Sequence, residues 1–149
     1  MDFLRTRDIR EVRDRLGKTQ AELAAMLGTS VRAVSSYEEG WRNASAPVHK
    51  LAALFCYLDW RREHGSLGPC WELRGCSPET RDQCVVYELD AGDLCWLFDG
   101  HDGPPVTNCP RRPSGTSCGE CPMVTPWLPR AADAGVPAPE CPRPEPPPS

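Results

Sequence analysis

The sequence lacks any apolar run long enough to cross a membrane as a helix, so we expect no membrane-spanning helix. We expect no secretory signal either. The chain opens with Met-Asp-Phe-Leu-Arg-Thr-Arg-Asp, which is too charged and has no apolar centre. We therefore expect a cytoplasmic protein in a reducing compartment, where structural disulfides are uncommon.

The signatures of common enzyme classes are also absent. The sequence has no glycine-rich phosphate loop, no His-Glu-x-x-His motif and no nucleophile elbow, and its three histidines are scattered. The nearby carboxylates Asp90 and Asp93 are most simply interpreted as turn residues. We expect no enzymatic activity, no catalytic residue and no small-molecule substrate.

What the sequence does contain is a compact pair of helix signals in residues 19–40. Thr19 can cap a helix and Glu22, three residues later, can complete a capping box. Gly28 suits the left-handed conformation that ends a helix, and Ser30 can cap the next one. These signals predict two short helices joined by a tight turn, the second over about residues 31–38.

The flanks predict two further helices around the same small core. Apolar residues at helical spacing indicate a helix over about residues 6–16, and Pro47 begins another that runs to about Arg62. Between them, the residues expected to be buried are Leu23, Ala24, Leu27, Val34 and Tyr37. On the last helix the predicted apolar stripe is Val48, Leu51, Ala52, Leu54, Phe55 and Leu58. A domain of about 60 residues is marginally stable alone, so the rest of the chain or a second subunit is expected to contribute.

Residues 19–43 resemble the helix-turn-helix of the Cro/lambda-repressor (XRE) family, and the flanks extend the resemblance to about residues 5–62. It rests on the Gln-Ala-x-Leu-Ala opening at Gln20, on Gly28 and Val34, and on the closing Tyr-Glu-x-Gly from Tyr37. The resemblance implies an all-α DNA-binding domain of four to five helices over residues 1–64. It also implies a homodimer on a two-fold site in double-stranded DNA.

In this fold the second helix of the motif enters the major groove. Arg32 is the main candidate for sequence readout, because a guanidinium can bond guanine O6 and N7 together. Val31 could contact a thymine methyl group, and Gln20 resembles the family's phosphate-contacting glutamine. The full set of predicted DNA-binding residues is Gln20, Ser30, Val31, Arg32, Ser35, Ser36, Arg42 and Asn43. Alternatives to DNA contact stay open. Arg32 and Arg42 could be ordinary solvated charges on the surface, and Trp41 could pack on the domain.

Charge is divided unevenly along the chain. Residues 1–64 hold eleven Lys and Arg against nine Asp and Glu, whereas residues 65–149 hold six against twelve. The front is only modestly basic, so DNA affinity is expected to depend on a localised basic face and on dimerisation. The acidic rear is expected to avoid DNA and to serve in sensing or in binding a partner.

Cysteine is the second informative feature. Seven of the nine cysteines lie in a segment with few large apolar residues, so disulfides, zinc or an iron–sulfur cluster would have to hold it together. In a reducing compartment metal ligation is favoured over disulfides. The predicted metal ligands are Cys70, Cys76, Cys84, Cys95, Cys109, Cys118 and Cys121.

Cysteine spacing does not decide the metal. Cys118-Gly-Glu-Cys121 suits a tetrahedral zinc site, but the second short pair that is typical of such sites is missing. Iron–sulfur clusters accept thiolates from more scattered positions, so a cluster is favoured and zinc is the alternative. His101 is interpreted as a loop residue, Cys56 as a small buried apolar residue, and Cys141 is left out of the ligand set.

Residues 69–125 resemble the small bacterial two-CW cysteine-rich module, through the Cys-Trp pairs at Cys70 and Cys95 and the closing Cys118-x-x-Cys121. Trp71 and Trp96 would shield a metal centre from water, form a small core, or do both. We therefore divide the chain into a reader (1–64), an irregular cysteine-rich module (65–125) and a disordered proline-rich tail (126–149). Residues 63–69 are expected to form a short hinge.

The sequence thus predicts a transcriptional regulator whose rear module binds a metal centre and senses redox or metal state. A competing interpretation is a constitutive DNA-binding or antitoxin-like adaptor, with structural zinc used for dimerisation or partner recruitment. A third is a small electron carrier that retains a helix-turn-helix.

Overall fold

The computed structural model describes residues 9–99 and 121–128, and within these ranges the chain forms helices and turns without a strand. The all-helical front is therefore confirmed. Predictions for Cys109, Cys118, Cys141 and His101, and most of the predicted tail, fall outside the described residues. None of the described helices is both long and apolar enough to cross a membrane.

Three short helices come first: α1 (Ile9–Leu16), α2 (Gln20–Leu27) and α3 (Val31–Glu38). The predicted capping box is present, since the Thr19 hydroxyl accepts a bond from the Glu22 N–H and the Glu22 carboxylate accepts one from the Thr19 N–H. Gly28 ends α2 at φ 71°, in the left-handed region. The turn between α2 and α3 is thus fixed by its own residues.

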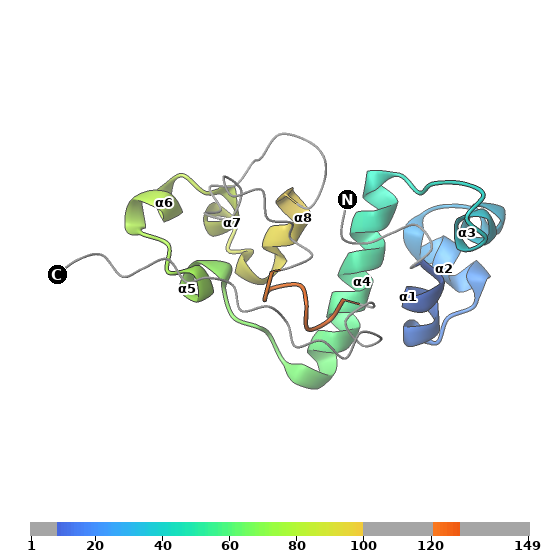
Figure 1. The fold of residues 1–149 in the computed structure, drawn as a ribbon, viewed down its shortest axis with the longest axis horizontal. Helices are drawn as coiled ribbons and strands as arrows, with labels where there is room; N and C mark the ends of the chain where they lie inside the picture. Colours follow the sequence, from blue (N-terminus) through green and yellow to red (C-terminus); the bar gives the residue numbers. More distant parts are fainter. Residues whose placement is uncertain (1–8, 100–120, 129–149) are drawn as a thin grey trace.

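The long helix α4 (Ala46–His64) lies between α1–α3 on one side and the cysteine-rich segment on the other (Figure 1). Pro47 lies in its first turn, as predicted, and Gly65 follows its end. The predicted stripe accounts for only one of its faces. Ala53, Cys56 and Tyr57 are also buried, whereas Leu58 is 37% exposed. The reason is that α4 packs against α1–α3 on one side and against residues of the rear, such as Trp96 and Trp127, on the other.

Residues 70–99 of the cysteine-rich segment form very short helices. They are α5 (Cys70–Arg74), α6 (Pro78–Asp82), α7 (Val85–Glu88), the 3₁₀ turn η2 (Gly92–Leu94) and α8 (Cys95–Asp99). Gly92 is buried because η2 lies directly against the start of α5. A Cβ atom on Gly92 would stand 2.6 Å from the Cα of Pro69 and 2.8 Å from the Trp71 ring. Glycine is therefore required for this close approach.

One apolar core joins the front and the rear. Residues of α1–α4 form a single cluster of buried residues with Trp96 of α8 and with Val124, Trp127 and Leu128. The segment 121–128, orange in Figure 1, runs between α8 and α4. Trp127 is fully buried, lies 5.6 Å from the Tyr57 ring centre and 4.7 Å from that of Trp96, and donates from Nε1 to the Met123 carbonyl at 2.8 Å. The rear thus completes the core of the front, as its small size led us to expect.

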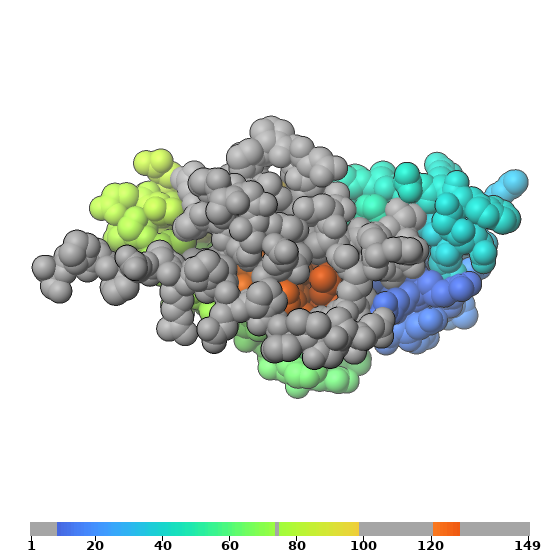
Figure 2. Space-filling model, viewed as in Figure 1, coloured from blue at the N-terminus to red at the C-terminus, as the bar shows by residue number. Residues whose placement is uncertain are grey.

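This packing corrects two expectations. The boundary of the disordered tail at residue 126 is wrong, because Trp127 and Leu128 are buried in the shared core. The segment 63–69 is not a hinge between separate bodies, since α4 itself runs to His64 and its side chains pack against the rear. Among the described residues, α3 lies toward one end of the molecule and α6 toward the other (Figure 2).

Candidate nucleic-acid interface

Helix α3 has one buried and one accessible side. Ala33, Val34, Tyr37 and Glu38 are buried, whereas Val31 and Arg32 are exposed and Ser35 and Ser36 are half-buried. The Ser30 hydroxyl caps the helix by accepting a bond from the Ala33 N–H at 3.1 Å. The predicted groove-facing side chains are therefore accessible, at the N-terminal end and along one side of a well-capped helix.

The hydroxyl groups on this side have different hydrogen-bonding capacity. The Ser36 hydroxyl donates to the Arg32 carbonyl at 2.9 Å, so its oxygen is left to accept bonds. The Ser30 oxygen accepts from Ala33, so its own O–H is left to donate. Donors suit phosphate oxygens, and acceptors suit the amino groups on base edges.

Most arginines of residues 9–64 are already paired. Arg10, Arg13 and Arg15 of α1, and Arg61 and Arg62 of α4, each lie within ion-pair distance of a carboxylate. Within residues 9–64, by contrast, four cations make no ion pair with a described residue: Lys18, Arg32, Arg42 and Lys50. These four precede α2, lie on α3, follow α3 and lie near the start of α4. Their charge is available to a polyanion.

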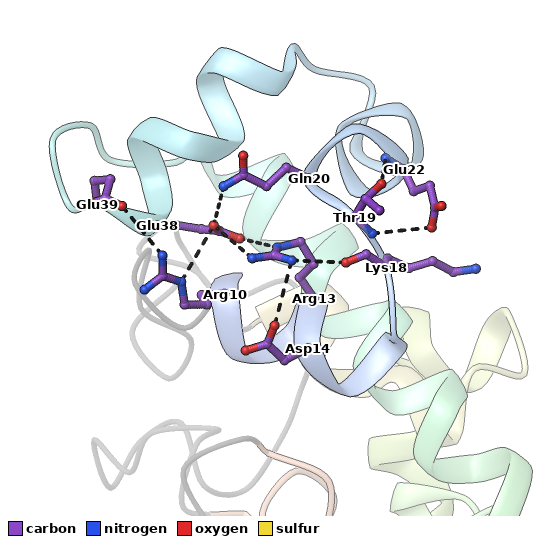
Figure 3. A network of polar contacts seen from close by, with 9 residues as sticks. All are labelled: Arg10, Arg13, Asp14, Lys18, Thr19, Gln20, Glu22, Glu38 and Glu39. Carbon is purple, nitrogen blue, oxygen red and sulfur yellow. Dashed lines mark hydrogen bonds and ion pairs between the residues drawn. The ribbon is translucent and has the colours of Figure 1, made fainter.

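A buried carboxylate holds α3 against α1 (Figure 3). The Glu38 side chain has no exposed surface. It accepts bonds from Arg13 Nε at 2.5 Å and Gln20 Nε2 at 2.7 Å, and Arg10 Nε lies 3.8 Å away. Arg13 also donates to the Lys18 carbonyl at 3.2 Å. Helices α1, α2 and α3 are thus tied together by one charged residue.

The protonation state of this network follows from its geometry. Burial alone would raise the pKa of Glu38, but the bonds from Arg13 and Gln20 and the charges of Arg13 and Arg10 outweigh it, and the pKa is lowered. The bond to Glu38 raises the pKa of Arg13, despite an opposing effect of burial. Both groups are therefore charged at neutral pH.

Gln20 is also placed by this network. Its amide nitrogen donates one bond to Glu38, and a primary amide has a second N–H and an oxygen available. Arg42 and Asn43 lie in the exposed loop between α3 and α4. The predicted DNA-binding residues thus come from the start of α2, from α3 and from the loop after it.

A comparison with known families agrees with this geometry. Residues 9–59 match the helix-turn-helix family model, which covers less than half of the chain. This part of the chain is a helix-turn-helix domain. No curated protein and no solved structure matches the sequence. The resemblance to a two-CW module is not supported by these comparisons.

Sequence reasoning missed the residues that hold the helix-turn-helix domain to the rest of the chain. The Tyr57 hydroxyl donates to Asp93 Oδ2 at 2.7 Å, and Arg61 Nη1 lies 3.6 Å from the same oxygen. Burial and the neighbouring carboxylate raise the pKa of Tyr57 to about 12. Arg15 Nη1 donates to the Trp127 carbonyl at 3.0 Å. No local sequence signal marks these contacts, because the partners lie far apart in the chain.

The described cysteines of the module lie at or close to the ends of the short helices, except for Cys121. Cys70 begins α5, Cys84 precedes α7, Cys95 begins α8, and Cys121 is buried at the start of the last described segment. Within residues 9–99 and 121–128, no three His, Cys, Asp or Glu side chains come close enough to hold a metal ion. Cys109 and Cys118 fall outside these ranges. The predicted set of seven metal ligands is therefore not tested as a whole, and it stays a prediction.

The two Cys-Trp tryptophans differ in their surroundings. Trp96 is fully buried in the shared core, whereas Trp71 is half-buried and meets the Tyr87 ring edge-on at 4.9 Å. The core interpretation therefore accounts for Trp96. Cys56 is buried as predicted, and burial raises the pKa of its thiol although Arg15 partly offsets the effect. A protonated, enclosed thiol is a poor nucleophile.

Proposed function

We propose that this protein is a transcriptional regulator that binds a specific sequence in double-stranded DNA through α3. The observation that carries the proposal is the contrast on its helix-turn-helix domain. Arg32 is exposed on α3 without an ion pair to any described residue, while Arg10, Arg13 and Arg15 of α1 are paired with carboxylates. An unpaired, forked donor on the accessible side of an anchored helix suits a guanine edge.

The other predicted residues take positioning roles. Val31, Ser35 and Ser36 would lie along the bases with Arg32, whereas Gln20 and Ser30 would donate to phosphates at the helix N-termini. Arg42 and Asn43 would contact the backbone beyond the carboxyl end of α3. A homodimer would place two such helices one turn of DNA apart.

For the cysteine-rich module we propose a metal centre, with an iron–sulfur cluster favoured over zinc. The support is compositional: seven cysteines lie between residues 70 and 121, and residues 70–99 of this segment form helices of only three to five residues. The described residues alone do not supply three ligands, so the proposed set needs Cys109 or Cys118. When bound, a cluster would supply one-electron redox chemistry, and thiolates from the set Cys70, Cys76, Cys84, Cys95 and Cys121, together with Cys109 or Cys118, would hold it.

Contacts in the shared core support a role of the module in controlling DNA binding. Arg15 of α1 donates to the Trp127 carbonyl, six residues after Cys121, and Arg13 of the same helix holds Glu38 of α3. A change of bonding at Cys121 would therefore act on a segment that touches the helix anchoring α3. Redox or metal sensing is the function proposed for this connection.

The competing function is a constitutive DNA-binding or antitoxin-like adaptor with structural zinc. The continuity of the core favours it, because a module that merely completes the fold needs no signal. Purification without oxygen separates the two. Brown protein containing iron and sulfide supports the sensor, and colourless protein containing zinc supports the adaptor.

The test of DNA binding is selection from a pool of random duplexes, followed by affinity measurements on the selected duplex and on scrambled competitor. Arg32→Ala is expected to lower affinity by about 1–3 kcal/mol and to relax the preference at one base pair. Arg42→Ala is the matched control, since it should weaken binding to all duplexes alike. Selection that enriches no sequence, with protein in oxidised, reduced and metal-free forms, would overturn the proposal.

A further inference from the structure

Trp41 is the most exposed large apolar side chain among the described residues, at 84% of its full accessible surface. The next highest value is 60%, for Leu89. An indole in water on a small domain carries a cost in free energy, because its large apolar surface is left hydrated. The packing alternative for Trp41 is therefore wrong for the described chain, and its exposure needs another explanation.

The backbone of Trp41 is nevertheless fixed to α3. Its N–H donates to the Ser36 carbonyl at 3.0 Å, the Gly40 N–H donates to the Tyr37 carbonyl at 3.1 Å, and Gly40 has a φ of 77°. This is the common left-handed helix ending, in which the residue after the glycine usually packs on an apolar side chain one turn back. The residue at that position is Ser36. Trp41 is therefore held in place without its usual intramolecular apolar partner.

The charges around Trp41 favour a polyanion as the partner. Glu39, the nearest acidic residue along the chain, lies 3.6 Å from Arg10, and Glu38 is buried with Arg13. Arg42, the next residue, is exposed and makes no ion pair with a described residue. The local positive charge is thus left available while the negative charges are compensated. A second copy of the chain would have to bring two such arginines together, which is less favourable.

We infer that Trp41 lies against the sugar–phosphate backbone of the DNA bound by α3. Its ring would cover a deoxyribose and its Nε1–H would donate to a phosphate oxygen, beside the contact made by Arg42. The inference rests on the proposed function. It adds a positioning residue that contributes affinity without reading sequence.

Three variants test the contact by affinity for the selected duplex and for a scrambled duplex. Trp41→Ala is expected to weaken binding to both by the same factor, about five- to tenfold, and Trp41→Phe by a smaller factor because it keeps the apolar ring. Leu89→Ala removes another exposed apolar side chain far from α3 and should change neither affinity. Unchanged affinity in Trp41→Ala would overturn the inference.

The salt dependence distinguishes the tryptophan from its neighbour. Arg42→Ala should reduce the slope of log affinity against log salt by about 1, because one fewer counterion is released. Trp41→Ala should leave the slope unchanged, since indole carries no charge. A reduced slope would show that the tryptophan variant acts through lost phosphate charge contacts, and would overturn the inference.

Fluorescence quenching by acrylamide reports the contact directly. The signal lost in Trp41→Phe identifies the contribution of the exposed indole, and added duplex should protect that contribution from quenching. Persistent quenching in the complex would overturn the inference. So would a shift of Trp41→Ala to a smaller species in sedimentation without DNA, which would assign the ring to a contact between copies. If the wild-type protein binds no duplex, it is the proposed function that fails.

Discussion

Glu38 shows how a single buried charge can organise the helix-turn-helix domain. Its carboxylate has no contact with water and depends on Arg13, Gln20 and Arg10 for stabilisation. Removing one partner from a buried pair is costly because the other charge is left poorly compensated. The position of α3 relative to α1 therefore depends on this residue.

We predict that Glu38→Gln lowers the free energy of unfolding by about 3 kcal/mol, measured by urea titration at neutral pH. The matched control is Glu39→Gln, which removes an exposed carboxylate from its ion pair with Arg10 and should cost less than about 0.5 kcal/mol. Equal losses in the two variants would contradict the role assigned to burial.

Because of Glu38, we also expect the free energy of unfolding to depend on pH in the acid range. Because the pKa of Glu38 is lower in the folded protein than in the unfolded chain, its stabilisation is complete above the ordinary glutamate pKa. It is lost as the pH falls through the lowered value. The difference in unfolding free energy between wild type and Glu38→Gln should therefore shrink in acid, and a difference independent of pH would contradict this.

At the scale of the element, the turn between α2 and α3 depends on Gly28. The residue has a φ of 71°, and its N–H lies at the end of α2. Space is not limiting, because a Cβ atom at Gly28 would meet nothing within 4 Å. The backbone conformation alone therefore disfavours other residues here.

We predict that Gly28→Ala lowers the free energy of unfolding by about 1 kcal/mol, as measured by thermal or urea unfolding. Gly28→Asn is the control, since asparagine enters the left-handed region more readily and should lose less. An alanine variant as stable as wild type would show that the turn can relax to another conformation.

These elements explain why part of the structure was predictable from sequence. The caps at Thr19 and Ser30, the stop at Gly28 and the buried positions of α2 and α3 follow from signals within a few residues of one another. The contacts that anchor the helices to one another do not follow from such local signals. Arg13 and Glu38 are 25 positions apart, Tyr57 and Asp93 are 36 apart, and Arg15 and Trp127 are 112 apart. Only the tertiary fold brings such partners together, which is why the burial of Ala53 and Tyr57 on the second face of α4 was not predicted, although that of Cys56 was.

Tyr57 and Asp93 form the polar contact between the carboxyl half of α4 and the rear. We predict that Tyr57→Phe lowers the free energy of unfolding by about 1.5 kcal/mol, because it removes a hydrogen bond to a carboxylate. Tyr87→Phe is the matched control. It removes a hydroxyl from a tyrosine that is 40% exposed and should be close to neutral.

Alkaline titration tests the same bond. The pKa of Tyr57 is raised to about 12 in the folded protein, so its stabilisation is complete below the ordinary tyrosine pKa and is lost as the pH rises through about 12. The stability difference between wild type and Tyr57→Phe should diminish over that interval. If the difference in unfolding free energy did not change with pH, the stabilisation would not come from the hydrogen bond that the Tyr57 hydroxyl donates.

At the scale of the whole molecule, the shared core predicts that the helix-turn-helix domain and the rear unfold together. Trp127 is fully buried among residues of both parts, and its carbonyl accepts bonds from Arg15 and Cys56. Trp127→Ala should therefore destabilise by about 3–5 kcal/mol and lower the midpoint of front and rear alike. Circular dichroism would follow the helical residues, most of which are in α1–α4, and tryptophan fluorescence would include the rear, where Trp71, Trp96 and Trp127 lie.

The control for Trp127→Ala is Trp41→Ala, which removes an equally large side chain that is exposed and should barely change stability. Coincident transitions by the two probes are expected in wild type and in both variants. Fluorescence could instead report that the rear of a variant unfolds first, while circular dichroism shows an unchanged unfolding midpoint for the front. In that case the two parts would unfold independently and would not share one cooperative core. A change at the cysteines could then not reach α3 through packing, because no stability would be shared between them.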